Sequence, residues 1–310
     1  MQGTTLIPAC LAALLAVAAT AAEPGAGGAD DVEFLRLARD DDRLVSLDTA
    51  IVEYARPAAP PGPGGGKPPL RVDLVAAVHL GSGTYYDTLD RLFTEYDAVL
   101  YELVAPPNAR PKPGGKPTGA LGSAQQGLTQ MLGLEFQLDR VDYTAANFVH
   151  ADLSPKEFDA AMRKRGESWW SMFMKLMKEG MARAEREGGR AGNDVTFGEM
   201  FGILFGTPEA RQLKLRRIMA EQFTDMEALT AAFGGEQGST LITDRNAAAL
   251  RVLREQIGRG RRRLAIFYGA AHMADFDRRL RADFGLQPRE TEWLEAWDLR
   301  EPAPAAAARR

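Results

Sequence analysis

The chain has 310 residues, 45% of them hydrophobic, and is long enough to bury a substantial core as one domain of about 250 residues. Its formal net charge of −4 argues against a nucleic-acid-binding protein. Arginines cluster at Arg259–Arg263, but a short basic run that closes a helix is typical of a solvated turn, and we expect no nucleic-acid partner.

The amino-terminal segment has the pattern of an export signal. Residues 6–22 form an apolar run that ends in the small residues of a cleavage site. We predict a signal peptide over residues 1–22 and a periplasmic or secreted mature protein, with an amino-terminal membrane anchor as the alternative. The single cysteine, Cys10, lies within this run, so the mature chain would contain neither a disulfide nor a cysteine-ligated metal.

If the signal interpretation is right, amino-terminal sequencing of the secreted protein should begin near Ala22 or Glu23, because cleavage follows small residues. Edman degradation or mass spectrometry of the exported chain makes the measurement. An intact Met1 recovered from a membrane fraction would identify an anchor instead.

Residues 23–42 are expected to be a linker and the start of the mature chain, and a single domain is expected over residues 43–300. Arg43–Tyr54 has the composition of a strand, and the low-complexity run Pro57–Pro69 predicts a hairpin loop that leads into the next strand. A second low-complexity run, Pro106–Gly119, is interpreted as a surface insertion, with a lid over a site as the alternative.

Two further strand-like runs bring ionisable residues into apolar surroundings. Val72–His79 ends in a histidine, and Ala98–Leu103 carries Glu102, whose carboxylate would be costly to bury without a partner. Between them, Thr84–Tyr96 has apolar residues at helical spacing. A helix that joins two strands predicts a crossover between parallel neighbours, which would bring His79 and Glu102 to the same edge of the sheet.

The middle of the chain is predicted to be a helical insert, residues 154–233, that covers the site. Ser154 and Pro155 have the pattern of a helix start, and Thr207 opens another helix that runs to about Phe233. Between these helices, Ser168–Glu187 carries methionines and aromatic residues at helical spacing, a pattern typical of a packing surface. Contact with a peptide or a membrane surface is the alternative for that run.

The last part of the chain supplies a second histidine at a strand end. Thr240–Gly258 is predicted to be a helix that carries Arg245 and Asn246, and Leu264–His272 is strand-like; residues 301–310 are expected to be a disordered tail. A histidine just past a buried strand faces the crevice where open α/β sheets bind ligands. We therefore predict an α/β fold with a central mixed, mostly parallel sheet flanked by helices.

These segments resemble the TraB/PrgY/GumN family, which is related to the TIKI metalloproteases and more distantly to the erythromycin-esterase and ChaN-like proteins. The resemblance rests on a strand ending in G-x-x-H, a helix, a strand with a glutamate, a helix with an Arg-Asn pair and a second G-x-x-H, in that order. The second motif is intact from Gly269 to His272, whereas Ala76 stands where the first usually has glycine. The resemblance covers the chain from about Leu70 onward.

The resemblance implies a hydrolase of a peptide or related amide that uses a divalent metal ion of the Mn, Co or Zn class, with His79, His272 and Glu102 as ligands. Imidazole and carboxylate suit such an ion, which lowers the pKa of a bound water toward neutrality. Glu102 is either a ligand or the general base. Arg245 is expected to orient a carboxylate or stabilise an oxyanion, with a structural salt bridge as the alternative.

Other residues are secondary candidates. Asn246 and Gly269 belong to the motifs above, Tyr101 and Tyr143 are candidates for hydrogen bonds around the site, and His150 is expected to be structural more than a third ligand. The sequence contains neither G-x-S-x-G nor H-E-x-x-H, which argues against a serine hydrolase and a conventional zincin. Two other interpretations stay open: a non-catalytic envelope protein that binds a peptide or small ligand, and a metal-independent, esterase-like hydrolase.

Overall fold

The computed structural model of the protein describes residues 32–56, 68–107, 109–114, 119–168, 207–233 and 238–301. The expected signal peptide, nearly all of the Ser168–Glu187 run and the expected tail beyond residue 301 lie outside these ranges. Within the ranges described, no helix is both long enough and apolar enough to cross a membrane.

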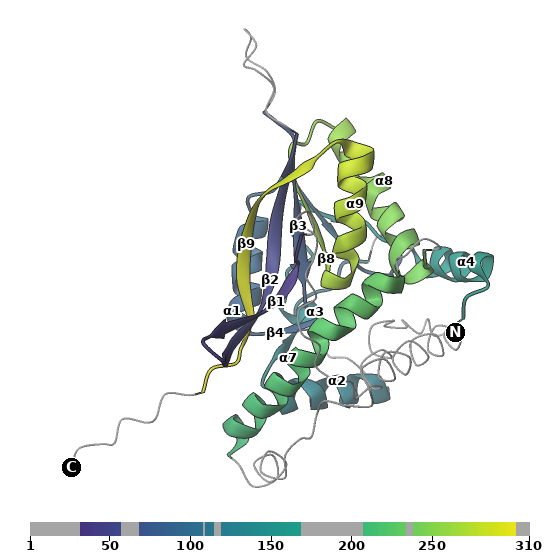
Figure 1. Cartoon of the computed structure of the whole chain (residues 1–310). Helices are drawn as coiled ribbons and strands as arrows, with labels where there is room; N and C mark the ends of the chain where they lie inside the picture. The colour runs from purple at the N-terminus through teal and green to yellow at the C-terminus, as the bar shows by residue number, and fades with distance from the viewer. Residues whose placement is uncertain are drawn as a thin grey trace.

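A seven-stranded mixed sheet forms the centre of the molecule (Figure 1). The strand order is β1-β2-β3-β8-β5-β7, and β9 also pairs with β2. The strands are β1 (Leu35–Asp40), β2 (Arg43–Ala55), β3 (Arg71–Ala77), β5 (Ala98–Tyr101), β7 (Phe148–His150), β8 (Arg263–Gly269) and β9 (Gln287–Asp298). Because β2 is antiparallel to its partners and the other pairs are parallel, every strand of this sheet except β2 runs in one direction.

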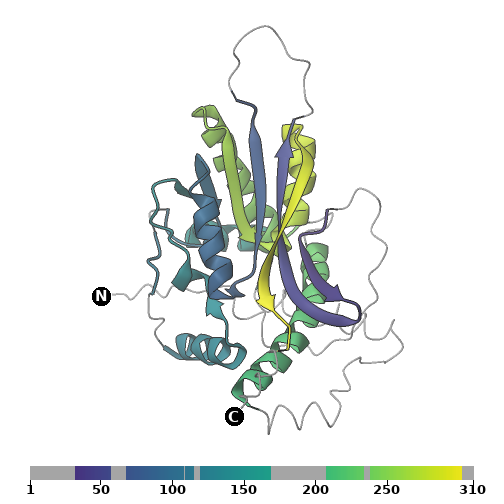
Figure 2. The same ribbon diagram turned by 90° about the vertical axis from the view of Figure 1, so that its left-hand side faces the viewer.

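Helices flank the sheet on both faces, with α1 in front of it in Figure 2 and α8 and α9 behind. The helices are α1 (Gly83–Phe93), α2 (Gly119–Leu132), α3 (Gln137–Arg140), α4 (Pro155–Arg165), α7 (Pro208–Phe233), α8 (Arg245–Gly258) and α9 (Met273–Phe284). A π-helical turn (Thr240–Asp244) precedes α8 and a 3₁₀ turn (Ala270–His272) precedes α9. The predicted α/β fold, with a mixed, mostly parallel sheet and flanking helices, is confirmed.

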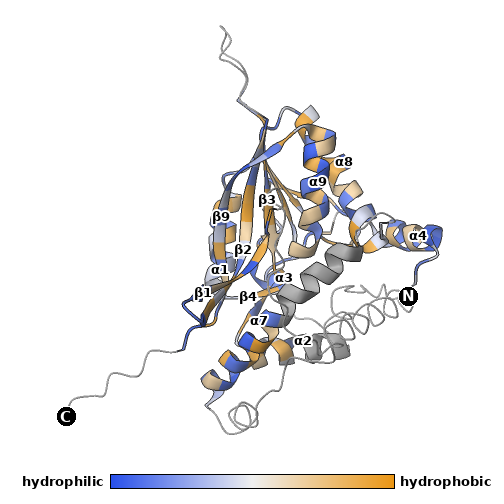
Figure 3. Ribbon diagram, in the orientation of Figure 1, coloured by the Kyte–Doolittle hydropathy of each residue, from blue (hydrophilic) through white to orange (hydrophobic). Residues whose placement is uncertain are grey.

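The sequence explains why the central strands lie where they do. β3 and β8 are almost continuously apolar, as expected for parallel strands that helices cover on both faces, and nearly all of their residues are buried. Figure 3 shows hydrophobic residues along the central strands and hydrophilic residues on the outer helices. The core around them also contains large side chains from β2, β9 and α9, among them Tyr54, Trp297 and Phe276.

One expectation about the topology is wrong. The strands that carry His79 and Glu102, β3 and β5, are parallel but not neighbours, because β8 lies between them. β8 pairs with β3 along its whole length, from Arg263 to Gly269, and with β5 on its other edge. The helix α1 between β3 and β5 therefore crosses over a strand that is contributed by a segment more than 160 residues farther along the chain.

Several element boundaries also differ from the expectations. Residues 23–42 were expected to be a linker and the start of the mature chain, and no strand was expected there, but β1 (Leu35–Asp40) lies in this segment and pairs with β2. β5 ends at Tyr101, so Glu102 follows the strand instead of lying within it. β8 ends at Gly269, and His272 belongs to the 3₁₀ turn. The helix expected from Thr240 begins with the π-helical turn, and the side chain of Ser239 caps that turn.

The helical insert is described in part. α4 begins after Ser154, as the sequence predicted, and it does so with a capping box in which Ser154 and Glu157 exchange hydrogen bonds. α7 extends from Pro208 to Phe233 and packs against β1, α2 and the 3₁₀ turn that carries His272. Residues 169–206, between these helices, lie outside the described ranges, as does the loop at residues 57–67.

Candidate active site

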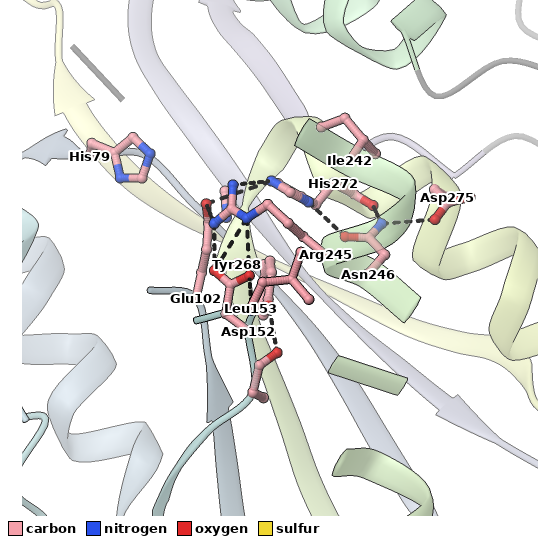
Figure 4. A network of polar contacts seen from close by, with 12 residues as sticks. His79, Glu102, Asp152, Leu153, Ile242, Arg245, Asn246, Tyr268, His272 and Asp275 are labelled. Carbon is pink, nitrogen blue, oxygen red and sulfur yellow. Dashed lines mark hydrogen bonds and ion pairs between the residues drawn. The ribbon is translucent and has the colours of Figure 1, made fainter. Parts of the chain in front are cut away.

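Four parallel strands end at one edge of the sheet, and each is followed by an ionisable side chain. His79 lies two residues after β3, Glu102 directly after β5 and Asp152 two residues after β7. His272 ends the 3₁₀ turn that follows β8. Because β8 runs between β3 and β5, these side chains approach one another over its carboxyl end, where open α/β sheets bind ligands (Figure 4).

Gly269, the last residue of β8, lies at the centre of this group. A Cβ atom at this position would be 3.3 Å from Oε2 of Glu102, 3.9 Å from Nε2 of His79 and 4.0 Å from Cδ2 of His272. Three polar side chains therefore lie within 4.0 Å of the position that a Cβ atom of residue 269 would occupy, and we call this position the Gly269 gap. The structure thus brings together the three residues that the sequence singled out as metal ligands.

The Glu102 carboxylate is held by charged and neutral donors. Its Oε1 accepts a hydrogen bond of 2.7 Å from Nη2 of Arg245, and its Oε2 accepts one of 2.7 Å from the backbone N–H of Gly269. Burial raises the pKa of Glu102, but the Arg245 guanidinium, together with His272, His79 and the Gly269 N–H, outweighs burial and holds that pKa well below its ordinary value. Glu102 is therefore an anion at neutral pH.

Arg245 links Glu102 to a second buried carboxylate, that of Asp152. Its Nε and Nη2 donate to Oδ1 and Oδ2 of Asp152 at 3.0 and 2.6 Å, a bidentate pair. The Asp152 side chain is fully buried, and those of Arg245 and Glu102 are 6% and 7% exposed. Arg245 directs most of its donors at these two acids, so the geometry matches the salt-bridge alternative more closely than an oxyanion-binding role.

His272 has a defined tautomer. Its Nδ1 lies 2.6 Å from Oδ1 of Asn246, while Nδ2 of Asn246 donates to the His272 carbonyl at 3.1 Å and to Asp275 at 2.9 Å. Because both partners of Nδ2 are acceptors only, the amide orientation is fixed and Nδ1 of His272 must carry the proton. Nε2 is then the unprotonated nitrogen, and it lies 3.6 Å from Oε1 of Glu102.

Burial also keeps His272 neutral. It is the main cause that lowers the pKa of His272 to about 4, and the nearby Arg245 cation lowers it further while Glu102 opposes the change. The ring packs edge-on against Tyr268, whose hydroxyl donates to the carbonyl of Ala151 and so fixes the segment before Asp152. Asn246, a secondary candidate from the sequence, is therefore the residue that orients His272.

His79 is oriented by a residue that the sequence did not single out. Its Nδ1 lies 3.2 Å from Oε1 of Gln137, and its backbone carbonyl accepts from the Gln137 N–H at 2.9 Å. Gln137 follows β6 (Glu135–Phe136), which pairs with β4 (Leu80–Gly81) directly after His79. Nε2 of Gln137 in turn lies 2.8 Å from the hydroxyl of Tyr143.

Two secondary candidates, His150 and Tyr101, form hydrogen bonds to the loop after β5 and not to the side chains around Gly269. Nε2 of His150 donates to the Leu103 carbonyl at 2.6 Å, and the Tyr101 hydroxyl donates to the Ala109 carbonyl at 3.0 Å. Both contacts tie the strand ends to the loop after β5, which is a structural role. Ala76 lies inside β3, where its carbonyl accepts from the Tyr85 hydroxyl.

The types of side chain around Gly269 suit a divalent metal ion, but their positions in this structure do not. Two imidazoles and a carboxylate surround the Gly269 gap, and Glu102, Asp152 and Arg245 together carry one net negative charge in a buried setting. However, the described residues contain no group of three or more His, Cys, Asp or Glu side chains arranged to hold a metal ion. An ion could therefore bind here only with side-chain movement, for example of Glu102 away from Arg245.

Comparison with known proteins adds no further evidence. No family model, no curated protein and no solved structure matches this chain. The resemblance to the TraB/PrgY/GumN family therefore stays a prediction, and the case for a function rests on the residues described above.

Proposed function

We propose that this protein is a hydrolase whose active site is the gap over Gly269, and that a divalent metal ion held by His79, His272 and Glu102 assists the reaction. The observation that supports this most is the convergence of these three side chains on one glycine at the carboxyl edge of a parallel sheet. The resemblance to the TIKI branch of metalloproteases supports a peptide or a related amide as substrate. The export signal expected at residues 1–22 would place the activity in the periplasm or outside the cell.

The residues of the site have distinct tasks under this proposal. His272 offers an unprotonated Nε2 because Asn246 occupies its Nδ1, an arrangement typical of metal-ligating histidines. Arg245 keeps Glu102 ionised, and Asp152 holds Arg245 beside it. When bound, the ion would supply Lewis-acid polarisation and lower the pKa of water.

A metal-independent hydrolase is the second candidate, and one observation favours it. Glu102 already accepts two strong hydrogen bonds, and no complete ligand group exists among the described residues. In that case His79 would accept the proton of the attacking water, with Gln137 holding its ring. A binding protein without catalysis is the remaining alternative.

The proposal is tested by measuring metal content and hydrolysis for the purified full chain and its variants. We expect elemental analysis after dialysis against Zn²⁺, Co²⁺ and Mn²⁺ to find one ion per chain, and a panel of peptide p-nitroanilides and p-nitrophenyl acetate to reveal hydrolysis. His79→Ala and His272→Ala should each lose the ion and the activity, because each removes a ligand. Glu102→Gln separates its two roles, since loss of the ion marks a ligand and retention with lost activity marks a base.

His150→Ala is the matched control, because His150 bonds the Leu103 carbonyl and should leave metal content and rate unchanged. Full activity after proven removal of the metal would assign the metal-independent mechanism. Activity that survives in the double variant of His79 and His272 would overturn both hydrolase proposals at this site.

A further inference from the structure

The two site histidines are held in closely similar ways. In each case Nδ1 lies beside the oxygen of a buried side-chain amide, Asn246 for His272 and Gln137 for His79. Both residues are almost fully buried, and each also donates to the backbone carbonyl of the histidine that it holds, Asn246 from its side-chain amide and Gln137 from its backbone N–H. The proposed function accounts for Asn246 through the Arg-Asn motif, whereas it uses Gln137 only to hold the ring of His79 in the metal-independent alternative and does not address the tautomer of that ring.

We infer that Gln137 is the positioning residue of His79: its Oε1 accepts the Nδ1–H of His79 and leaves Nε2 unprotonated beside Glu102 and the Gly269 gap. This inference rests on the proposed function for its purpose, which is to present two imidazole Nε2 atoms to one place. Its structural content, the tautomer of His79, can be tested without any metal or substrate.

The amide orientation of Gln137 decides that tautomer. With Nε2 of Gln137 donating to the Tyr143 hydroxyl at 2.8 Å, Oε1 faces His79 and needs a proton on Nδ1. The flipped amide would place Nε2 of Gln137 on His79 and shift the histidine proton to Nε2, beside Glu102. Such a proton would occupy the nitrogen that the proposed ligand or general base uses, so the proposed function requires the first orientation.

The fold supplies a dedicated element for this contact. β4 and β6 form a separate two-stranded ribbon outside the main sheet, with Leu80 paired with Phe136 and Gly81 with Glu135. Its register places Gln137 next to His79, where the backbone N–H of Gln137 donates to the His79 carbonyl. Residue 137 is thereby fixed at both its backbone and its side chain.

Imidazole nitrogen NMR of the metal-free protein measures the tautomer directly. The sequence has only three histidines, so each ring can be assigned by its own His→Gln variant. We expect His79 and His272 to carry the proton on Nδ1 and His150 to carry it on Nε2, since His150 donates from Nε2 to the Leu103 carbonyl. A proton on Nε2 of His79 in the unmodified chain would overturn the inference.

Variants of Gln137 supply the second measurement. Gln137→Leu should convert His79 to a mixture of tautomers and weaken Co²⁺ binding by about 10- to 100-fold, the usual effect of losing the partner of a ligating histidine. Gln137→Glu should restore the Nδ1–H tautomer and most of the affinity, because a carboxylate accepts the same proton. Unchanged tautomer and affinity in Gln137→Leu would overturn the positioning role.

Gln256→Leu is the control for the loss of a buried glutamine. Gln256 is 1% exposed and lies eleven residues after Arg245 on α8, roughly 16 Å along the helix. It should leave the tautomer of His79 and the Co²⁺ affinity unchanged. If the unmodified chain binds no Co²⁺, the metal-dependent proposal fails, and the NMR of Gln137→Leu alone then decides the role of Gln137.

Discussion

Gly269→Ala is expected to inactivate the site while the protein stays folded. The new methyl group would lie 3.3 Å from Oε2 of Glu102 and within 4 Å of His79 and His272, in the gap where a substrate atom or an ion has to fit. Gly269 has φ −54° and ψ 142°, which any residue adopts, so the backbone needs no change. We expect hydrolysis to fall by about 100-fold, because the methyl group would displace an ion or substrate atom that has to lie there, and a displacement of about 1 Å has that effect.

Circular dichroism and thermal unfolding should show a native Gly269→Ala variant, and a Co²⁺ titration should show weakened binding. Gly258→Ala is the matched control: no atom lies within 4 Å of the position where its Cβ would be, at the end of α8. It should keep both binding and rate. A Gly269→Ala protein with full activity would mean that the reaction takes place elsewhere.

Arg245→Met is expected to destabilise the protein by about 3–5 kcal/mol, since it leaves Glu102 and Asp152 buried without their cation. The sequence led us to expect that Arg245 orients a carboxylate or stabilises an oxyanion, and this loss of stability corresponds to the alternative, a structural salt bridge. Urea or thermal unfolding of the variant gives the free-energy difference. Arg300→Met removes a half-exposed arginine from two surface carboxylates and should cost less than about 1 kcal/mol.

A double-variant cycle separates the lost ion pair from lost packing. Combining Arg245→Met with Asp152→Asn removes the cation together with its fully buried anion, and it should recover part of the stability that Arg245→Met alone loses. No recovery would indicate that the packing of the Arg245 side chain, and not its charge, stabilises this region.

Much of the site was predictable because it lies at strand ends. Buried parallel strands are nearly continuous apolar runs, so the segments that end near His79 and His272 stand out in the sequence, and the helix α1 shows its period clearly. Arg245 and Asn246 were found through a motif. In the structure these two residues hold other side chains of the site, Arg245 holding Glu102 and Asn246 holding His272.

The remaining features depend on pairing that leaves no local pattern. Gln137 reaches His79 through a ribbon of two-residue strands, too short for any periodicity. Asp152 follows β7, a strand of three residues, and its only local signal is its place two residues after His150. β8 lies between β3 and β5 although it is far from both in the sequence, and no local pattern shows this pairing. The tendency of successive strands to pair predicts β3 beside β5, which is wrong here.

The central place of β8 also determines when the site can form. Synthesis proceeds from the amino terminus, so β3, α1 and β5 emerge long before Arg263–Gly269, the strand that joins them. Until that segment arrives, β3 and β5 lack their shared partner, and closing so long a loop is a slow step in folding. A chain truncated before residue 263 would therefore lack the site, and a newly made chain would form the site only as its last strands dock.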